Sequence, residues 1–301
     1  MLAGRVAVVT GAGRGIGCGH ALELARQGAR VVVNDLGFAR DGTGAPDPAV
    51  AEAVVEEIRA AGGQAVSVVA DAADGEGARS IIDAAVDTFG RLDVVVNNAG
   101  VLRDRMMVNL LLEDWDAVIR GHLRSTFAVS QAAAVHWRAQ AKAGEPTDAR
   151  IINTSSPSGL YGNVGQANYG AAKAGIAAFT VISAMELQRY GVTVNAIAPI
   201  ARTRMTDDLG IDLSPAEGEF DVYNPDNVAP LIAWLASSES GAVTGRVFNI
   251  VGGKISLAIG WQAGPETDVG ARWEASEIGP AVEHLLAAMT NDVSDGYRID
   301  P

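Results

Sequence analysis

A tyrosine and a lysine stand four residues apart in a stretch whose apolar spacing predicts a helix. Tyr169 and Lys173 lie within the pattern Ala167–Tyr190, so their side chains share one helix face. An unperturbed tyrosine titrates near 10, and bringing its pKa to neutrality takes about 4 kcal/mol. One ammonium about 4 Å away, at an effective dielectric of about 20, supplies an energy of that size. The pair therefore predicts a phenol that takes a proton from an alcohol or gives one to a ketone.

Four hydroxyl side chains follow an apolar run that ends near Ile152. Ser156 comes thirteen residues before the tyrosine and is placed to hold a substrate oxygen beside it. Three neighbours compete for that role on composition alone: Thr154, Ser155 and Ser158. Ordinary turn capping also explains any single one of these hydroxyls, so the spacing by itself leaves the choice open.

A glycine-rich turn stands between a valine run and a helical pattern. It reads Thr-Gly-Ala-Gly-Arg-Gly-Ile-Gly over residues 10–17. Glycines in this place permit a tight turn and let the backbone approach a pyrophosphate at the helix N-terminus. Such a turn alone is weak evidence, but its position between strand and helix strengthens it. The residues expected to bind a dinucleotide here are Gly11, Arg14, Gly15, Ile16 and Gly17.

Acidic residues end the second and third valine runs. Asp35 is placed to accept both ribose hydroxyls of adenosine and to repel the extra phosphate of NADP, which favours NAD. The alternative is a solvated turn residue. Asp71, with Ala72 beside it, is a candidate for binding the adenine edge, although a helix N-cap explains it nearly as well.

Seven short apolar runs rich in β-branched residues alternate with stretches of helical spacing. The runs are Val6–Val9, Val31–Val33, Val66–Val69, Val94–Val96, Ile151–Ile152, Val192–Ile197 and Val247–Val251. Near-continuous valine without polar alternation indicates burial on both faces, as in a parallel sheet. We expect an α/β, Rossmann-type doubly wound sheet of seven parallel strands with helices on both faces. Its ligands should lie at the carboxyl edge, where the strand order reverses.

We expect one NAD-binding and catalytic domain over residues 1–253 and a C-terminal extension over 254–301. The extension carries a helical pattern at Pro280–Met289 and is expected to pack on the same domain or on an oligomer partner, with a substrate lid as the alternative. Gly37–Pro48 is predicted to be a loop before a helix at Ala49–Ala61.

The composition narrows the possible partners. The 301 residues carry a formal net charge of −13, so neither nucleic acid nor a membrane surface is an expected partner. A polyanionic substrate such as a CoA ester would need a local cluster of arginines. The single cysteine, Cys18, has no companions at metal-ligand spacing, so no metal is expected, and a reducing cytoplasm fits best. The chain starts without the pattern of a signal peptide.

These motifs together resemble the short-chain dehydrogenase/reductase family. The matching parts run in order through residues 5–251: the glycine motif, Asn97-Asn98-Ala99-Gly100 after the fourth strand, Ser156, and Tyr169 with Lys173. The resemblance implies that Asn98, Ala99 and Gly100 brace the sheet beside the nicotinamide ribose. It also implies that the lysine holds this ribose while relaying protons.

Two positions depart from the usual pattern of the family. The segment Pro199–Thr203 resembles the loop that contacts the nicotinamide carboxamide, but Ile200 replaces the usual glycine. Most members also carry an asparagine on the helix before the fifth strand, where its backbone carbonyl anchors a water in the proton relay. This chain has His122 there. A relay role through the main-chain carbonyl and a structural histidine bonded within its own helix are both open.

A finer resemblance links the chain to one subgroup, the dehydrogenase units of the type 2 peroxisomal multifunctional enzymes. The matching segments are 34–37, 102–106, 122–124, 158–163, 165–169, 198–199 and 204–206. The subgroup implies a (3R)-hydroxyacyl-CoA or 17β-hydroxysteroid substrate and shares the histidine noted above. Arg103 and Arg105 then become candidates to meet CoA phosphates, with solvated loop arginines as the alternative.

The family resemblance further implies a homodimer or homotetramer with the helix at Ala167–Tyr190 in the interface. Another alcohol or ketone metabolite is the alternative substrate. A protein that binds NAD without turnover is a remote alternative, because Tyr169 and Lys173 are both present.

Overall fold

The computed structural model describes residues 1–202, 215 and 218–288. Its elements are, in chain order, β1 Val6–Thr10, α1 Gly15–Arg26, β2 Arg30–Asn34, α2 Pro48–Ala60, β3 Gln64–Val68, α3 Gly75–Phe89, β4 Val94–Asn97, α4 Leu112–Ile119, α5 Ser125–Lys142, β5 Ala149–Thr154, α6 Pro157–Tyr161, α7 Ala167–Leu187, β6 Val192–Ile200, α8 Ala229–Leu235, β7 Val247–Val251, β8 Lys254–Leu257 and α9 Ala275–Ala287. A 3-10 turn lies at Met107–Asn109, and a π-helical turn at Arg120–Arg124 joins α4 to α5.

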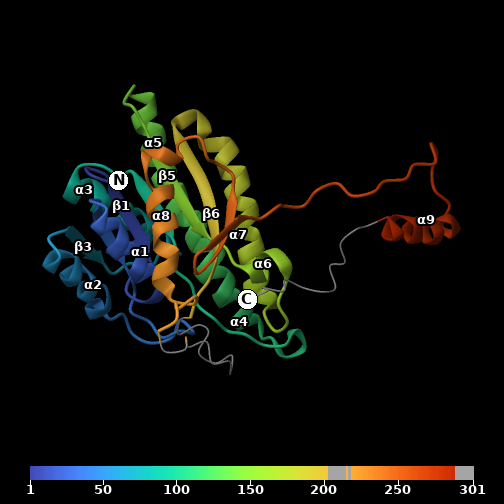
Figure 1. Cartoon of the computed structure of the whole chain (residues 1–301), viewed down its shortest axis with the longest axis horizontal. Coiled ribbons are helices and arrows are strands. Elements are labelled where there is room, and N and C mark those ends of the chain that lie inside the picture. The colour runs from blue at the N-terminus through green and yellow to red at the C-terminus, as the bar shows by residue number, and fades with distance from the viewer. Residues whose placement is uncertain (203–214, 216–217, 289–301) are drawn as a thin grey trace. The chain divides into compact units, whose positions relative to one another are not determined.

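One sheet runs through the catalytic part of the chain in the order β3-β2-β1-β4-β5-β6-β7-β8 (Figure 1). The seven expected strands are present and parallel, which confirms the predicted doubly wound α/β class. An eighth strand, β8, pairs antiparallel with β7. The last expected strand is Val247–Val251, so β8 was not predicted. All four of its residues are exposed, so no buried valine run marks it.

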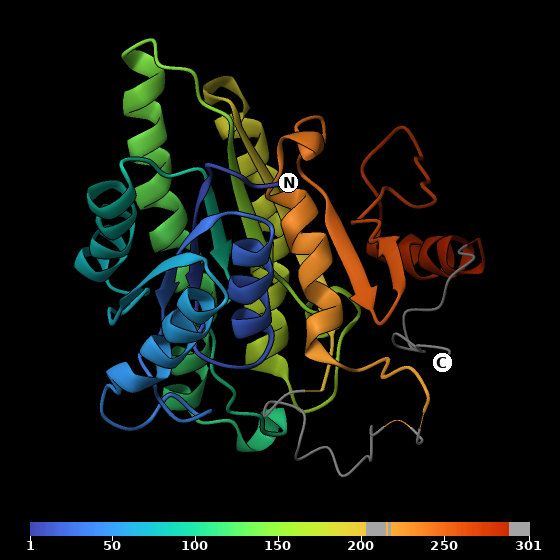
Figure 2. The same cartoon turned by 60° about the vertical axis from the view of Figure 1, so that its left-hand side comes forward.

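Helices cover both faces of the sheet, as continuous burial of its strands requires. Apolar side chains of α1, α2 and α8 pack on one face, and those of α3, α5 and α7 pack on the other. In Figure 2, α1 and α8 lie together in front of the strands. Trp137 of α5 is fully buried on the opposite face and donates its indole N–H to the carbonyl oxygen of Leu92 at 2.8 Å. Successive side chains of each strand point to opposite faces of the sheet, so the strands contribute to one hydrophobic core on each face.

The strand order reverses between β1 and β4, since β2 and β3 lie on one side of β1 and β5 to β8 lie beyond β4. Loops that leave the carboxyl ends of neighbouring strands diverge at such a point and leave room for a ligand. The fold therefore directs attention to the turns that follow β1, β4 and β5.

The chain divides into two compact units, residues 1–258 and 259–301. In the second unit, α9 begins five residues before the predicted pattern, because Glu274 and Glu277 form a capping box at its start. Met289, the last residue of the predicted helix, lies outside the described residues.

Helix α7, together with the 3-10 turn Gln188–Tyr190, has the length and mean hydropathy of a membrane span, and it alone does so within the described part of the chain. It is nevertheless bonded to the sheet through polar groups. Thr180 accepts a hydrogen bond from Asn153 of β5 at 2.9 Å, and Lys173 donates to the end of the same strand. These contacts are those of a helix in an α/β unit.

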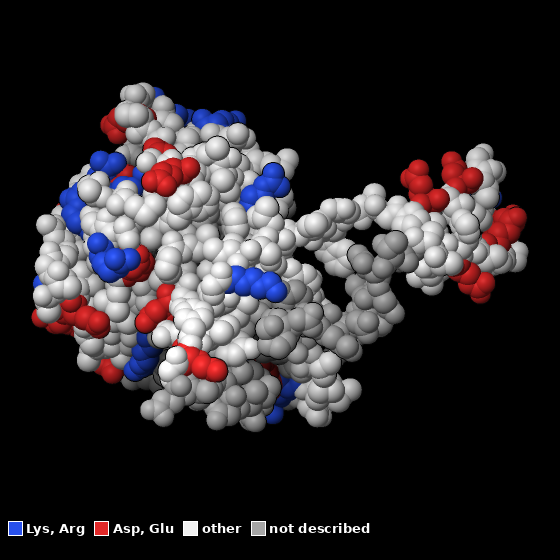
Figure 3. Space-filling model, viewed as in Figure 1, with Lys and Arg blue, Asp and Glu red and all other residues white. Residues whose placement is uncertain are grey.

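On the face drawn in Figure 3, the described Lys and Arg residues lie in several separate places, with Asp and Glu residues between some of them. The described residues of this face form no extended positive patch of the kind that attracts a phosphate backbone.

His20, on α1, gives the fold a defined sensitivity to acid. Its side chain is fully buried, and neither ring nitrogen has a hydrogen-bond partner among the described residues. Burial lowers the pKa of His20 to about 3. The unfolded chain binds a proton at this imidazole below about pH 6.5, whereas the folded chain binds it only near pH 3, so protons favour unfolding between these values.

We expect a His20→Gln variant to lose part of the pH dependence of stability. Between pH 6.5 and 4, the free energy of unfolding of the wild type should fall more steeply than that of the variant, by up to about 1.4 kcal/mol per pH unit. Urea unfolding curves at several pH values measure both slopes. His284→Gln, on exposed α9, is the matched control and should keep the wild-type slope. Equal slopes for wild type and His20→Gln would contradict the assignment.

Candidate active site

The carboxyl ends of β1 and β4 are joined by hydrogen bonds where the strand order reverses. The hydroxyl of Thr10 accepts from the backbone N–H groups of Asn98 and Ala99, at 3.1 and 3.2 Å. Asn98 donates its side-chain amide to the carbonyl oxygens of Thr10 and Gly11, at 3.2 and 3.0 Å. The glycine turn and the Asn-Asn-Ala-Gly turn therefore lie against each other.

The glycine turn leaves no room for side chains at its closest approach. A Cβ on Gly17 would lie 2.2 Å from the carbonyl oxygen of Gly11. Helix α1 begins at Gly15, and no side chain caps its first N–H groups within the described structure, while Ile16 packs against the core. A bare backbone turn followed by uncapped helix N–H groups fits a pyrophosphate.

Asp35 lies beside this turn at the carboxyl end of β2. Its carboxylate accepts hydrogen bonds from the N–H groups of Gly13 and Gly37, at 2.9 and 2.7 Å. Arg14 is exposed on the same side, with Nη1 3.4 Å from the carbonyl oxygen of Phe38. A carboxylate fixed in this way is able to accept ribose hydroxyls with its remaining lone pairs.

Asp71 is held by neighbours after β3. Its carboxylate pairs with Arg120 at 2.8 Å and accepts the N–H of Ala73 at 2.9 Å. Asp74, not Asp71, is the N-cap of α3, so the N-cap interpretation of Asp71 was wrong. Ala72, the next residue, is buried.

Helix α7 is anchored to the end of β5 by two hydrogen bonds of opposite direction. Lys173 Nζ donates to the carbonyl oxygen of Thr154 at 2.6 Å. The hydroxyl of Ser155 donates to the carbonyl oxygen of Lys173 at 2.9 Å. Lys173 is only 3% exposed, so its ammonium depends on these few protein contacts. The end of the strand thereby fixes the helical turn that carries the lysine.

Of the four hydroxyls after Ile152, that of Ser156 acts on the phenol of Tyr169, because hydrogen bonding to Ser156 lowers the pKa of this tyrosine. Ser156 follows β5 and caps α6, accepting the N–H of Ser158 at 3.2 Å. Lys173 Nζ lies 5.5 Å from the centre of the Tyr169 ring. Tyrosine, serine and lysine thus meet at the carboxyl edge of the sheet, where a substrate oxygen can contact both hydroxyls.

Burial dominates the protonation of the pair. It raises the pKa of Tyr169 to about 12, against a lowering by the hydrogen bond with Ser156, and it lowers the pKa of Lys173 to about 7. A full positive charge about 5 Å away lowers a phenol pKa by roughly 2 at an effective dielectric near 20. The prediction from the spacing counted the ammonium and left out burial, which acts in the opposite direction on the pKa of Tyr169. The ammonium of Lys173 alone therefore does not bring this pKa to neutrality.

Asp104 and Gln166 belong to the site although the sequence analysis gave them no role. Gln166 Nε2 donates to a carboxylate oxygen of Asp104 at 2.6 Å, and the N–H of Arg105 donates to the carbonyl oxygen of Gly165 at 3.0 Å. Gln166 directly precedes α7, so these bonds hold the loop after β4 against the start of the helix. The Asp104 carboxylate further raises the pKa of Tyr169. In the sequence Asp104 is one charge in an Arg-Asp-Arg run, which no spacing rule marks.

The two arginines expected to meet CoA phosphates are paired within the protein. Asp114 of α4 contacts Arg105 at 2.8 Å and Arg103 at 3.5 Å. Asn168 also donates to the carbonyl oxygens of Arg103 and Asp114, at 3.0 and 3.4 Å. Both arginines therefore pair with the Asp114 carboxylate, and this pairing argues against a role for them in binding CoA phosphates.

His122 lies beneath the Asn-Asn-Ala-Gly turn. Its Nε2 is 2.8 Å from the carbonyl oxygen of Val101 and 3.2 Å from the Val101 nitrogen. The ring packs so closely on Gly100 that a Cβ there would lie 1.9 Å from a ring carbon. It also makes an edge-on contact with the Tyr169 ring, with centroids 5.1 Å apart. The alternative of a histidine bonded within its own helix was wrong.

The segment expected to contact the carboxamide is described in part. Pro199 and Ile200 end β6 and pair with Ile250 and Val251 of β7. Thr203 lies outside the described residues.

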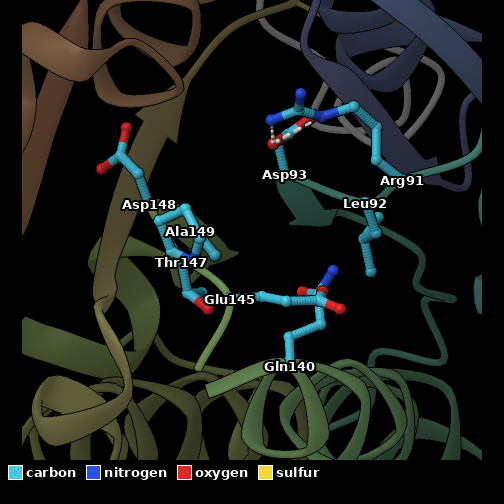
Figure 4. Close-up of a pocket in the computed structure, with 9 residues that line it drawn as sticks. Arg91, Leu92, Asp93, Gln140, Glu145, Thr147, Asp148 and Ala149 are labelled. Atoms are coloured by element: carbon cyan, nitrogen blue, oxygen red, sulfur yellow. Dashed lines mark hydrogen bonds and ion pairs between the residues drawn. The ribbon is translucent and has the colours of Figure 1, made fainter. Parts of the chain in front are cut away.

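A hollow of about 300 Å³ lies at the opposite edge of the sheet, before β4 and β5 (Figure 4). Arg91 and Asp93 face it and form an ion pair at 2.7 Å, and Asp93 accepts the N–H of Val6 at 2.8 Å. These groups tie down the amino ends of strands. The hollow is therefore no part of the edge that carries the tyrosine.

Comparison with known proteins agrees with this geometry. The family model described as short chain dehydrogenase matches residues 5–213. The hydroxyacyl-CoA dehydrogenase ChsB1 of Mycobacterium tuberculosis is 47% identical over 263 residues, which are 85% of this chain and 80% of that protein. Peroxisomal multifunctional enzyme type 2 of Mus musculus is 44% identical over 252 residues, 84% of this chain but 32% of that longer protein. A crystal structure of a short chain dehydrogenase from Mycobacterium avium has a TM-score of 0.87 at 52% identity and covers 96% of this chain, with 97% of its own chain matched.

These matches confirm the resemblance drawn from the motifs, including its link to the hydroxyacyl-CoA dehydrogenase subgroup. The chain belongs to the short-chain dehydrogenase family and is an oxidoreductase that acts on CH–OH groups.

Proposed function

We propose that the protein oxidises a (3R)-hydroxyacyl-CoA or a 17β-hydroxysteroid with NAD, using Tyr169 as the general base. The observation that carries this proposal is the meeting of the Tyr169 phenol, the Ser156 hydroxyl and the buried Lys173 ammonium beside the dinucleotide turns. The name of the Mycobacterium tuberculosis relative, a hydroxyacyl-CoA dehydrogenase, supports the acyl-CoA substrate.

The chemistry divides among three side chains. Ser156 holds the substrate oxygen by a hydrogen bond, and Tyr169 takes its proton during oxidation or returns it during reduction. Lys173, fixed on Thr154, stabilises the phenolate and binds the nicotinamide ribose, as in the family. When bound, oxidised nicotinamide accepts the hydride and adds the second positive charge that the buried phenol needs.

An apolar rim next to the site supports a substrate with a large apolar body. Its members are Met106, Met107, Val108, Leu111 and Val164, all more than half exposed. The rim continues directly from the Arg105–Gly165 contact that borders the catalytic helix. An acyl chain or a steroid offers the matching surface, whereas a small polar metabolite, the alternative substrate, leaves it in water.

Assembly and location stay predictions. Exposed Val181, Ile182 and Met185 lie on α7, the helix expected at the interface of a homodimer or homotetramer. A cytoplasmic location is the setting proposed for this enzyme.

Replacing Tyr169 by Phe tests the proposed base. The phenylalanine keeps the ring contacts but removes the hydroxyl, so we expect kcat to fall by about 100-fold or more while NAD affinity stays within a few-fold. Steady-state rates on (3R)- and (3S)-hydroxyacyl-CoAs and 17β-hydroxysteroids, with NAD and NADP, measure the first quantity. Titration of protein fluorescence with NAD measures the second. Undiminished turnover by Tyr169→Phe would refute the role of the tyrosine.

Asp35 tests the choice of dinucleotide. We expect Asp35→Ala to weaken NAD binding by about 10-fold, the value of one lost charge-assisted hydrogen bond. NADP should bind more tightly than to the wild type, because the repelling carboxylate is gone. Binding constants for both dinucleotides decide the matter. Asp41→Ala, on the exposed loop after β2, is the control, and an unchanged NAD:NADP ratio in Asp35→Ala contradicts the proposal.

Substitution of Asp104 tests how a nearby negative charge changes the pKa of Tyr169. Its negative charge raises the pKa of Tyr169, so Asp104→Asn should move the alkaline-rising limb of kcat/KM for oxidation to lower pH. One charge in a partly solvated site accounts for a shift of roughly 0.5 to 1 pH unit. Asp116→Asn, an equal change of charge on exposed α4, should leave the limb in place. If kcat/KM of Asp104→Asn rises at the same pH as in the wild type, or at a higher pH, the Asp104 carboxylate does not raise the pKa of Tyr169.

A further inference from the structure

Ser156 takes its direction from the short helix that it begins. It is the N-cap of α6, and its hydroxyl oxygen accepts the backbone N–H of Ser158 at 3.2 Å. Its carbonyl oxygen accepts the N–H groups of Gly159 and Leu160, at 3.0 and 3.2 Å. Helix α6 has five residues, and a helix this short is not stable without contacts to the rest of the protein. The direction of the Ser156 hydroxyl therefore depends on the contacts that hold α6.

Helix α6 lies directly against α7 at Gly159, and the two helices lie together in Figure 1. A Cβ on Gly159 would lie 2.5 Å from the backbone nitrogen of Ala174 and 2.6 Å from the Cβ of Lys173. Leu160 packs on a small buried cluster formed by Ala196, Ala198 and Val247. Apolar contacts of this kind have no preferred direction. They fix the place of α6 but not the direction of its axis.

A hydrogen bond at the far end of α6 supplies this direction. The hydroxyl of Tyr161, the last residue of the helix, accepts the side-chain amide of Asn249 at 2.9 Å. Asn249 lies on β7, pairs with Ala198 of β6 and is only 7% exposed. Strands β6 and β8 hold β7 from both sides, so the sheet sets the position of this amide. Contacts at Gly159 and at Tyr161 together fix the axis of the helix.

The asparagine on β7 is retained at a cost. Its Oδ1 is buried without a hydrogen-bond partner among the described residues, and its amide nitrogen lies 3.4 Å from the hydroxyl of Ser256. A buried polar group without a partner destabilises the folded chain, and an apolar residue would avoid this cost. Such departures from local rules are expected at functional sites. The cost therefore favours a role for Asn249 in the site over a role in folding.

We propose that Asn249 and Tyr161 position the Ser156 hydroxyl by holding the axis of α6. Both are positioning residues, because they act on the substrate only through Ser156. Without their hydrogen bond, α6 turns about its contact at Gly159 and the serine hydroxyl moves away from the phenol of Tyr169, whose pKa it lowers. The inference rests on the proposed function, which assigns the substrate oxygen to Ser156.

Removal of either partner should lower kcat through the serine. Tyr161→Phe removes the hydroxyl, and Asn249→Leu removes the amide at similar volume. We expect each to lower kcat about 5- to 10-fold, and the double variant to lose no more than the single ones. In a Ser156→Ala background, Tyr161→Phe should lower kcat by less than about twofold, because the group that it positions is gone. Steady-state rates on the substrate panel give these values, and thermal unfolding reports whether each variant is folded.

Tyr190→Phe is the matched control. Tyr190 is also partly buried, and its hydroxyl accepts a hydrogen bond from Arg189 at 2.7 Å, but it lies in the 3-10 turn before β6, at the amino edge of the sheet. This variant should keep the wild-type kcat. Wild-type kcat in Tyr161→Phe, or the same loss with and without the Ser156 hydroxyl, overturns the proposal. So does a loss in Tyr161→Phe with none in Asn249→Leu, since the tyrosine would then act on the substrate directly.

A measurement without turnover separates this inference from the choice of substrate. With NAD bound and tyrosine labelled with ¹³C at Cζ, the Tyr169 resonance, assigned by its loss in Tyr169→Phe, reports hydrogen bonding of the phenol. Ser156→Ala should shift this resonance, and Tyr161→Phe should shift it in the same direction, with no further shift in the double variant. A Tyr169 resonance unchanged by Tyr161→Phe contradicts the inference. If the wild type turns over no substrate of the panel, the proposed function fails, and this resonance still decides the inference.

Discussion

The hydrogen bond from Lys173 to the carbonyl oxygen of Thr154 is the constraint on which the site depends. It ties the catalytic helix to the end of β5 and holds an ammonium out of water. An ammonium with so few partners is costly, which is why burial lowers the pKa of Lys173 to about 7. The charge becomes favourable only when acceptors or a negative charge come close. Under the proposed function, the site suits a charge pair between this ammonium and the phenolate that forms when Tyr169 gives up its proton.

The parallel sheet brings together the groups that this pair requires. Thr10 ends β1, Thr154 ends β5 and Asn98 directly follows β4, and the carboxyl ends of these three strands share one edge. Hydrogen bonds among the first two align the dinucleotide turns, and the third fixes the lysine. Thr10 and Thr154 end buried strands and Asn98 directly follows one, so the positions of the loops follow from the packing of the sheet. A substitution in one of these loops therefore changes the ligand specificity of the site more readily than its position at the edge of the sheet.

The sequence alone predicted those elements whose residue pattern has a single physical cause. Continuous valine has few explanations other than a strand buried on both faces, and the seven parallel strands followed from it. The exposed strand β8 left no such mark. The N-cap of α3 was misassigned because two aspartates, Asp71 and Asp74, stand near its start, and only the backbone decides between them. Asp104 was missed because its partner Gln166 is 62 residues away, and no local spacing reports such a contact.

Charges around Tyr169 differ in how strongly water screens them. Lys173 is buried and acts through a low dielectric, whereas Asp104 is exposed at the rim and acts through solvent and salt. Burial raises the pKa of Tyr169 most, and the Asp104 carboxylate adds to the rise. A lowering of this pKa therefore has to come from groups that approach the phenol inside the buried site, where water screens charge little.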